Sequence, residues 1–185
     1  SDLSPFYEEK KGGSLLDSAR QAIDSHMPDQ GADALLNVFN AGCEGILVPC
    51  INDSLHQGFG LPVVNGEYPL ALLSEGAQLI RSLFFTTKEK RATILPCLPT
   101  AFHCGRIVGL NWEGVGKVDI EWTKKQIRRL HFTPSIDTTV CFHFSKEMAS
   151  YRLWRNTKDK GRRINCGESF EVKASNVYRL DRFEK

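Results

Sequence analysis

The feature that most constrains the fold is the alternation of residue types over positions 117–122. The apolar residues Val118, Ile120 and Trp122 alternate there with the polar residues Lys117, Asp119 and Glu121. A period of two places the apolar side chains on one face of a β-strand and the polar ones on the other. After a short polar turn at 123–125, residues 126–132 return with Leu130 and Phe132 on one face. This pair predicts an antiparallel hairpin with one buried and one solvated side.

Further short segments of the same kind follow toward the end of the chain. They are 139–144, where Val140, Phe142 and Phe144 alternate with Thr139, Cys141 and His143, and then 151–154, 162–165, 169–172 and 177–180. Short strands at regular spacing, separated by turns, are typical of a β-sandwich. We therefore expect residues 91–185 to form a β-sandwich domain.

Residues 1–90 show helical patterning instead. Apolar stripes predict helices over about 14–26, 32–40 and 69–85, and Pro69 suits the first turn of the last one. Pro28 and Gly31 are expected to end the first helix, Gly42 the second, and residues 86–90 to form a polar connector. The expected fold class is α+β, with N-terminal helices (1–90) packed on a C-terminal antiparallel β-sandwich (91–185).

The formal charge changes at the same point of the chain. Residues 1–90 hold 6 Lys and Arg against 12 Asp and Glu, a net charge of −6, whereas residues 91–185 hold 18 against 10, a net charge of +8. A basic half is compatible with nucleic acid or an anionic glycan, but the simpler explanation is that the two halves attract each other. No apolar run approaches the ~20 residues that span a bilayer, so no membrane contact is expected.

The cysteines and histidines do not indicate a metal or cofactor site. Six cysteines are present, at positions 43, 50, 97, 104, 141 and 166, and none has CxxC spacing. The five histidines show neither HxxxH nor HExxH spacing. We expect free thiols, which suggest a reducing compartment, no cofactor, and, because residues 1–13 are polar, no signal peptide.

Two basic clusters lie among the predicted strands. The first is Lys124, Lys125, Arg128 and Arg129; the second is Arg152, Arg155, Lys158, Lys160, Arg162 and Arg163. With Trp112, Trp122 or Trp154, the hairpin arginines Arg128 and Arg129 are candidate binding residues for a glycan, a nucleic acid or a protein. Because Lys and Arg also protect exposed strand edges, nucleic acid is not the partner we expect.

The segment 42–66 is the least regular and holds polar residues suited to chemistry, among them Asp53, His56, Gln57 and Asn65. Long loops inside compact domains are often functional. His56 and Gln57 are candidate binding residues, while the alternative is a packed connection between helices.

Several motifs together resemble a known family. They are Leu95-Pro96-Cys97-Leu98-Pro99, Ala101-Phe102, Gly105–Leu110 and Val118-Asp119-Ile120-Glu121-Trp122. In order and spacing, residues 64–135 resemble the start of the C-terminal β-domain of glycoside hydrolase family 95, whose members are α-L-fucosidases and, in some cases, α-L-galactosidases. The resemblance implies that the preceding helices are the last ones of an (α/α)6 catalytic barrel. The signature itself is structural and contains no catalytic residue.

The resemblance also implies candidate catalytic residues. A family motif of the kind I-D-G-N-F-G corresponds to Val64-Asn65-Gly66-Glu67-Tyr68-Pro69, so Asn65 stands where the family has a water-activating Asp and Glu67 where it has Asn. An amide can position water but cannot take its proton. Asp53 is a nearby carboxylate in the sequence, and Asn65, Glu67 and Asp53 are the candidates; the alternative is that Asn65 and Glu67 are turn residues.

Two functions follow as expectations. In the family the general acid lies upstream in the barrel, and hydrolysis with inversion requires both an acid and a base. The first expectation is therefore the C-terminal portion of a glycoside hydrolase that acts on fucose-type or related glycans, is not catalytic on its own, and has the upstream barrel and an oligosaccharide or glycoconjugate as partners. The alternative is a non-enzymatic binding module that uses the basic, aromatic-bearing β-surface.

Overall fold

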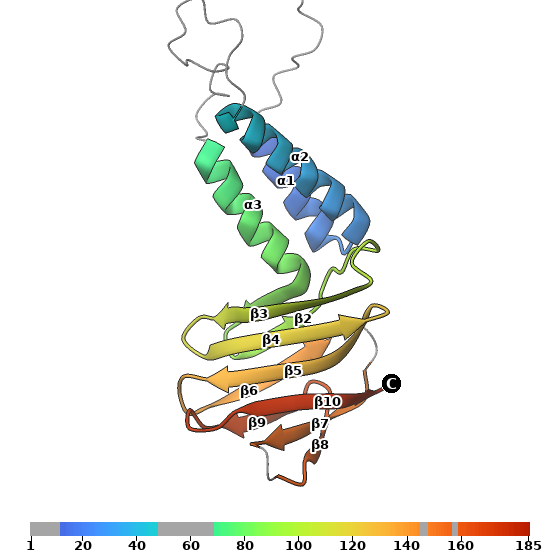
Figure 1. Ribbon diagram of the computed structural model, residues 1–185, viewed down its shortest axis with the longest axis vertical. Helices are drawn as coiled ribbons and strands as arrows, with labels where there is room; N and C mark the ends of the chain where they lie inside the picture. Colours follow the sequence, from blue (N-terminus) through green and yellow to red (C-terminus); the bar gives the residue numbers. More distant parts are fainter. Residues whose placement is uncertain (1–11, 48–68, 145–147, 157–158) are drawn as a thin grey trace, which may run out of the picture. The chain divides into compact units, whose positions relative to one another are not determined.

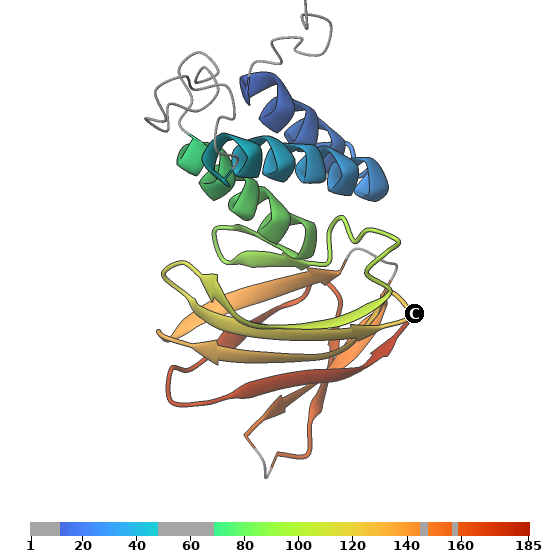
Figure 2. The same cartoon turned by 45° about the horizontal axis from the view of Figure 1, so that its top comes forward.

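The computed structural model describes residues 12–47, 69–144, 148–156 and 159–185 (Figure 1). The chain divides into two compact units, residues 1–82 and 83–185. The first is helical and the second is a sandwich of two sheets, whose two layers are seen in Figure 2. The predicted α+β class with a β-sandwich is thus confirmed. None of the helices in the described ranges is both long and apolar enough to cross a membrane.

The helical unit contains α1 (Gly12–Asp24), α2 (Pro28–Leu47) and most of α3 (Pro69–Phe84). Apolar side chains of α1 and α2, among them Ala19 and Val38, are fully buried. Gly76 of α3 lies against Val38, because a Cβ added there would be 3.2 Å from Val38 Cγ1. The guanidinium of Arg20 on α1 donates to Glu75 on α3 over 2.6 Å. Close packing and this ion pair hold the three helices together.

The boundaries of the first two helices differ from the prediction. Pro28 begins α2 instead of ending α1, and α2 continues past Gly42 to Leu47. The end of α1 is set by His26, whose φ of 56° is left-handed. His26 N donates to Ile23 O (3.0 Å) and Met27 N to Ala22 O (2.9 Å), the two bonds of a Schellman motif. The chain therefore turns at His26, and Pro28 takes the first position of the next helix, where its missing N–H costs nothing.

The sandwich consists of a four-stranded and a six-stranded sheet. The first has the order β1 (Phe85–Lys88), β2 (Arg91–Ile94), β6 (Thr138–Phe144), β9 (Ser169–Val172). The second has the order β3 (Cys104–Trp112), β4 (Gly116–Thr123), β5 (Gln126–Pro134), β10 (Tyr178–Glu184), β7 (Ser150–Arg155), β8 (Arg162–Asn165). Neighbouring strands are antiparallel, as predicted, except β2 and β6, which are parallel. The chain reaches β6 from β2 only after it has formed β3, β4 and β5 in the other sheet.

Strand β1 corrects the prediction that residues 86–90 are a polar connector. Phe85 pairs with Ile94 and Lys88 with Arg91 across a tight turn. The last carbonyls of α3 are satisfied by the same region, because Cys97 N donates to Leu83 O (3.1 Å) and Leu95 N to Phe84 O (2.7 Å). Helix α3 thus ends, one residue earlier than predicted, by bonding to the segment after β2.

The core lies between the two sheets and is rich in aromatic rings. The alternation of β4 is confirmed, since Val118, Ile120 and Trp122 are 0 %, 1 % and 3 % exposed. Trp112 of β3 contacts Phe132 of the same sheet and Phe142 of the opposite sheet, with ring centroids 5.6 and 5.5 Å apart. Burial of such rings is the main stabilising contribution in a domain of this kind.

Candidate functional site

Five of the predicted site residues lie outside the part of the chain that the structure describes. They are Asp53, His56, Gln57, Asn65 and Glu67. The roles assigned to them stay predictions. The other three predicted residues, Trp112, Arg128 and Arg129, belong to the sandwich.

Trp112 is a core residue. It is 1 % exposed, and its indole Nε1 donates to Glu89 O over 3.0 Å. Trp122 is buried likewise, and its Nε1 donates to Phe102 O over 2.8 Å. Neither ring presents a surface on which a ligand could stack, which corrects the expectation that Trp112 or Trp122 contributes to a binding face. Of the three tryptophans, only Trp154 reaches the surface.

Arg129 lies on the outward face of β5. It is opposite Glu121 in the β4–β5 register, with Nη1 3.8 Å from Oε2. Glu121 is also the register partner of Arg106 on β3. Both side chains of the Arg129–Glu121 pair are about half exposed, and exposed pairs of this kind contribute ~0–1 kcal/mol. Arg129 is therefore accessible but already has a carboxylate neighbour.

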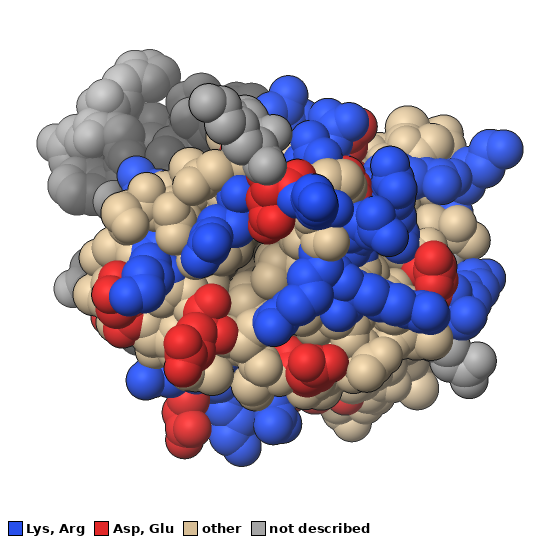
Figure 3. Space-filling model, turned by 90° about the horizontal axis from the view of Figure 1, so that it is seen from below, with Lys and Arg blue, Asp and Glu red and all other residues tan. Residues whose placement is uncertain are grey.

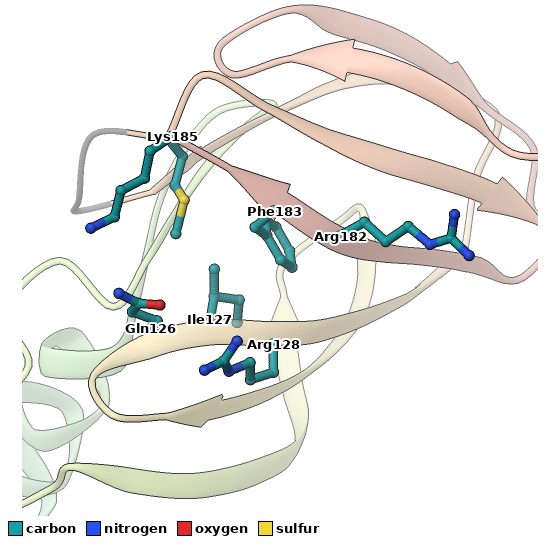
Figure 4. A pocket seen from close by; sticks show the side chains of 7 residues that line it. Gln126, Ile127, Arg128, Arg182, Phe183 and Lys185 are labelled. Carbon is teal, nitrogen blue, oxygen red and sulfur yellow. The ribbon is translucent and has the colours of Figure 1, made fainter.

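Arg128 occupies a β-bulge at the edge of a small cavity. Ile127 pairs with Trp122 and Arg129 with Glu121, so Arg128 is the extra residue of β5. The cavity has a volume of ≈ 140 Å³ and is lined by Gln126, Ile127, Arg128, Met148, Arg182, Phe183 and Lys185 (Figure 4). Arg182 extends away from Gln126 and Lys185 in this view. The cationic residues of the lining are Arg128, Arg182 and Lys185, beside the apolar Ile127 and Phe183.

Four side chains of β7 and β10 form what we call the Trp154 cluster: Arg152, Trp154, Arg179 and Arg182. The guanidinium carbons of Arg179, Arg182 and Arg152 lie 5.0, 5.5 and 5.8 Å from the centre of the Trp154 ring, within cation–π distance. Trp154 Nε1 donates to Asp181 Oδ1 over 2.7 Å, and Arg179 Nε lies 3.1 Å from Asp181 Oδ2. One carboxylate thus fixes the indole and one of the three guanidinium groups.

A second arginine is fixed beside this cluster, on β8. Arg163 Nη2 lies 2.8 Å from Glu184 Oε2, and Arg163 Nε donates to Ser150 Oγ over 2.9 Å. Ser150 Oγ in turn donates to Glu184 over 3.1 Å. Arg163 is also the register partner of Arg152. Many Lys and Arg side chains gather on the side of the sandwich where β7 and β8 lie, with Asp and Glu among them, as Figure 3 shows.

His131 adds no positive charge to this surface. It faces outward on β5, opposite Asp119 and Arg179, and its Nε2 is buried without a hydrogen-bond partner among the described residues. Burial lowers its pKa below the ordinary 6.5; Arg129 lowers it further, Asp119 raises it, and Arg179 and Arg106 lower it again. The imidazole is therefore neutral at pH 7.

A second cavity, of ≈ 280 Å³, lies beside the β1–β2 turn. It is lined by Lys88, Glu89, Lys90, Arg91, Thr139, Cys141 and Ser169. Glu89 is the one carboxylate among these residues. Burial raises the pKa of the Cys141 thiol, which donates to Gly167 O over 3.1 Å. A protonated, bonded thiol of this kind is not a nucleophile at neutral pH.

Comparison with known families matches residues 87–180 to glycoside hydrolase family 95, C-terminal domain. The chain belongs to glycoside hydrolase family 95. This confirms the resemblance suggested by the motifs between Leu95 and Trp122. No match was found among curated proteins. Since the match begins at residue 87, it does not test the assignment of the helices in residues 1–90 to the end of the barrel.

The motif residues that indicated family 95 are structural in this chain. A Cβ at Gly105 would lie 2.7 Å from Trp122 Cη2, so the glycine leaves room for the indole. Asp119 Oδ1 accepts a hydrogen bond from Gly109 N (2.8 Å) at a bulge of β3. These contacts build the β3–β4 pair of the family-95 sandwich and carry no chemistry.

Sequence reasoning missed Arg179 and Arg182 as members of the charged surface. The alternation of Tyr178 and Leu180, which are buried, does indicate that Arg179 points outward. That Arg179 meets Trp154 depends on the pairing of β10 with β7, two strands that are not consecutive in the chain. No local pattern in the sequence of this family-95 member predicts that β10 pairs with β7.

Proposed function

We propose that this chain is the C-terminal portion of a family-95 glycoside hydrolase that acts on fucose-type or related glycans and is not catalytic on its own. The observation that carries the proposal is the match of residues 87–180 to the family's C-terminal domain. The substrate class, fucose-type glycans, is inferred from the resemblance to α-L-fucosidases alone.

The residues that line the two cavities described above support the proposal that the chain is not catalytic on its own. Hydrolysis with inversion needs two carboxyl groups about 6.5–9.5 Å apart, one as acid and one as base. Among the described residues, no carboxylate side chain lines the cavity beside Arg128, and Glu89 is the only one that lines the cavity beside the β1–β2 turn. Neither cavity supplies the pair, which favours a site that is completed by another part of the protein.

The helical unit supports the presence of further helices around it. Leu36 of α2 is 59 % exposed and Ile80 of α3 is 39 % exposed, although both helices also bury apolar residues. A helix that is apolar on more than one side usually packs against more than one partner. We propose that the upstream barrel of the same protein covers these side chains.

Asn65, Glu67 and Asp53 are proposed to line the sugar pocket of the complete enzyme. Asn65 would position the attacking water, and Asp53 or Glu67 would act as its base. In the longer protein, Asp53→Asn or Glu67→Gln should lower kcat on an aryl fucoside about 10²-fold or more, the ordinary effect of losing a general base. Lys90→Ala, on the sandwich, is the matched control and should leave kcat unchanged.

The test of the proposal compares the longer protein with this chain. The longer protein should release nitrophenol from nitrophenyl α-L-fucoside or from the corresponding α-L-galactoside, and the 185-residue chain alone should release none. Turnover by the chain alone would show that the chemistry lies within it. If the longer protein hydrolyses neither glycoside, the proposed substrate class is wrong.

A further inference from the structure

The Trp154 cluster carries more positive charge than its surroundings compensate. Asp181 is paired with Arg179, and Glu184 is paired with Arg163. Arg152 and Arg182 have no carboxylate partner within the part of the chain that the structure describes; each lies over the Trp154 ring. Two guanidinium groups at one site are therefore available to an anion.

These guanidinium groups are held in place before any ligand arrives. The Trp154 ring lies within 5.0–5.8 Å of Arg152, Arg179 and Arg182, and the ring itself is fixed by its hydrogen bond to Asp181. A free arginine loses much rotamer freedom when it binds a ligand, and a side chain that already rests on an aromatic ring loses less. The cluster is preorganised for binding through its arginines.

The same arrangement leaves Trp154 poorly suited to stack on a neutral sugar or a nucleotide base. Three guanidinium groups lie over the ring, and Gly161 packs so closely that a Cβ there would lie 2.9 Å from Trp154 Cδ2. Binding of single-stranded nucleic acid usually relies on open aromatic faces. Recognition at this site must therefore come from the guanidinium groups, whose planar fork matches a carboxylate or a phosphate.

The basic surface extends across four adjacent strands. Arg128 lies on β5, Arg179 and Arg182 on β10, Arg152 on β7 and Arg163 on β8. Neighbouring strands are about 4.8 Å apart, so the row spans about 14 Å. Arg182 also lines the cavity that contains Arg128, which makes the cluster and the cavity contiguous. A linear chain with charges at intervals contacts several of these groups at once, whereas a single small anion contacts one or two.

We infer that the outward face of the six-stranded sheet, centred on the Trp154 cluster, binds an anionic polysaccharide that carries carboxylate groups. The choice of a glycan over other polyanions rests on the proposed function. The carboxylate is the anionic group of such a glycan that the planar fork of arginine matches. The site is distinct from a hydrolytic pocket: it holds the polymer and performs no chemistry on it.

The test measures binding of the 185-residue chain to oligogalacturonate by calorimetry, with neutral dextran, dextran sulfate and single-stranded DNA as comparisons at the same ionic strength. Oligogalacturonate should bind most tightly, and its affinity should fall as salt is added, because ion pairs are screened. Equal or tighter binding of any of the three comparisons would overturn the choice of ligand.

Substitutions on the two sheets test whether oligogalacturonate binds at the Trp154 cluster. Arg152→Ala/Arg182→Ala removes two unpaired guanidinium groups and should weaken oligogalacturonate binding at least about 10-fold. Lys88→Ala/Lys90→Ala removes the same charge from the other sheet and should change the affinity less than about 2-fold. Arg152→Lys/Arg182→Lys keeps the charge without the planar fork, and should lie between the parent and the alanine variant. Equal losses in the first two variants, or a lysine variant that binds like the parent, would overturn the inference.

Failure of this inference is distinguishable from failure of the proposed function. Hydrolysis of a neutral aryl fucoside by the longer protein requires no contact with the Trp154 cluster. A longer protein that cleaves the fucoside, together with a chain that does not bind oligogalacturonate, rejects only the binding site. Unchanged thermal unfolding of the variants would exclude loss of fold as the cause of weaker binding.

Discussion

Among single residues, Tyr151 carries a buried hydroxyl that no group in the described ranges satisfies. Its side chain is 1 % exposed and its ring packs against Phe144 and Phe183, but its hydroxyl has no hydrogen-bond partner in the described part of the chain. Burial raises the pKa of this hydroxyl far above its ordinary value, so it stays protonated at any working pH. The group is desolvated without compensation.

We expect Tyr151→Phe to increase the free energy of unfolding by about 1 kcal/mol, because it removes an unsatisfied hydroxyl and keeps the ring. Tyr178→Phe is the matched control. Its hydroxyl accepts a hydrogen bond from Lys173 N (2.9 Å), and its loss should decrease the stability by about 1 kcal/mol. Urea denaturation followed by tryptophan fluorescence measures both. A Tyr151→Phe variant as destabilised as Tyr178→Phe would show that the hydroxyl has a partner, such as a buried water.

His131 makes the stability of the sandwich depend on pH. Its pKa is lowered in the folded chain, first by burial and then by Arg129, with Arg179 and Arg106 acting in the same direction and Asp119 opposing them. The unfolded chain takes up a proton near pH 6.5, whereas the folded chain resists it until a lower pH. The contribution of His131 is therefore fully present above pH 6.5 and decreases as the pH falls toward the folded-state pKa.

Accordingly, His131→Gln should flatten the decline of unfolding free energy between neutral and mildly acidic pH. The comparison variant is His103→Gln, at an exposed position, which should keep the decline of the parent. Urea titrations at a series of pH values give the slope directly. An unchanged slope in His131→Gln would contradict this assignment.

At the level of elements, the sequence predicts those whose signal is local. The period of two in β4 is enough to place Val118, Ile120 and Trp122 in the core, because one face of that strand is buried and the other solvated. The bounds of β8 and β9 also agree with the predicted 162–165 and 169–172. Where local pattern and tertiary context agree, the strands can be read from the sequence.

The bounds of other elements depend on tertiary contacts that no local sequence pattern indicates. Gly42 lies within α2, although glycine usually signals a stop, and the left-handed residue that does end α1 is His26, without a glycine. Thr86 and Lys88 are polar but form a strand because β2 provides a pairing edge. The charged surface was predictable in part, since Arg128 and Arg152 were visible as basic clusters, but their neighbours on β10 are set by long-range pairing.

The β3–β4 turn offers a prediction about backbone contact. Gly116 lies so close to β5 that an added Cβ would clash with Thr133 O and lie 2.8 Å from Pro134 Cα. We expect Gly116→Ala to destabilise the chain by about 3 kcal/mol, because backbone atoms cannot move aside as a side chain can. In the same turn, Gly114 has a φ of 66° but open space around a Cβ.

Gly114→Ala should therefore cost only about 1 kcal/mol, the cost of a left-handed alanine. The midpoints of thermal unfolding separate the two variants. Equal destabilisation would mean that backbone conformation, and not the contact with β5, determines the choice of glycine in this turn.

For the whole molecule, the two units differ in the size and composition of the core that each one contains. The sandwich surrounds a continuous cluster of rings, including Trp112, Phe132 and Phe142, and satisfies the carbonyls at the end of α3 from within. The helical unit leaves Leu36 and Ile80 exposed. The sandwich leaves apolar side chains exposed as well, such as Val108 at 62 %, so exposure does not separate the two units. What separates them is the core, because the sandwich has a large aromatic core of its own.

This difference predicts that residues 83–185 fold without residues 1–82. Because all three tryptophans, Trp112, Trp122 and Trp154, lie in the sandwich, tryptophan emission and the tryptophan bands of the near-ultraviolet circular dichroism report on that unit alone. The isolated fragment should give the same tryptophan bands in the near ultraviolet and a cooperative unfolding transition, since the hydrogen bonds of Leu83 and Phe84 remain inside it. Fragment 1–82, with its apolar side chains uncovered, should unfold without cooperativity or associate.

If fragment 83–185 lacks a near-ultraviolet signal, or if the full chain unfolds in a single transition at a higher temperature than the fragment, the sandwich depends on the helices and the two units are one cooperative domain.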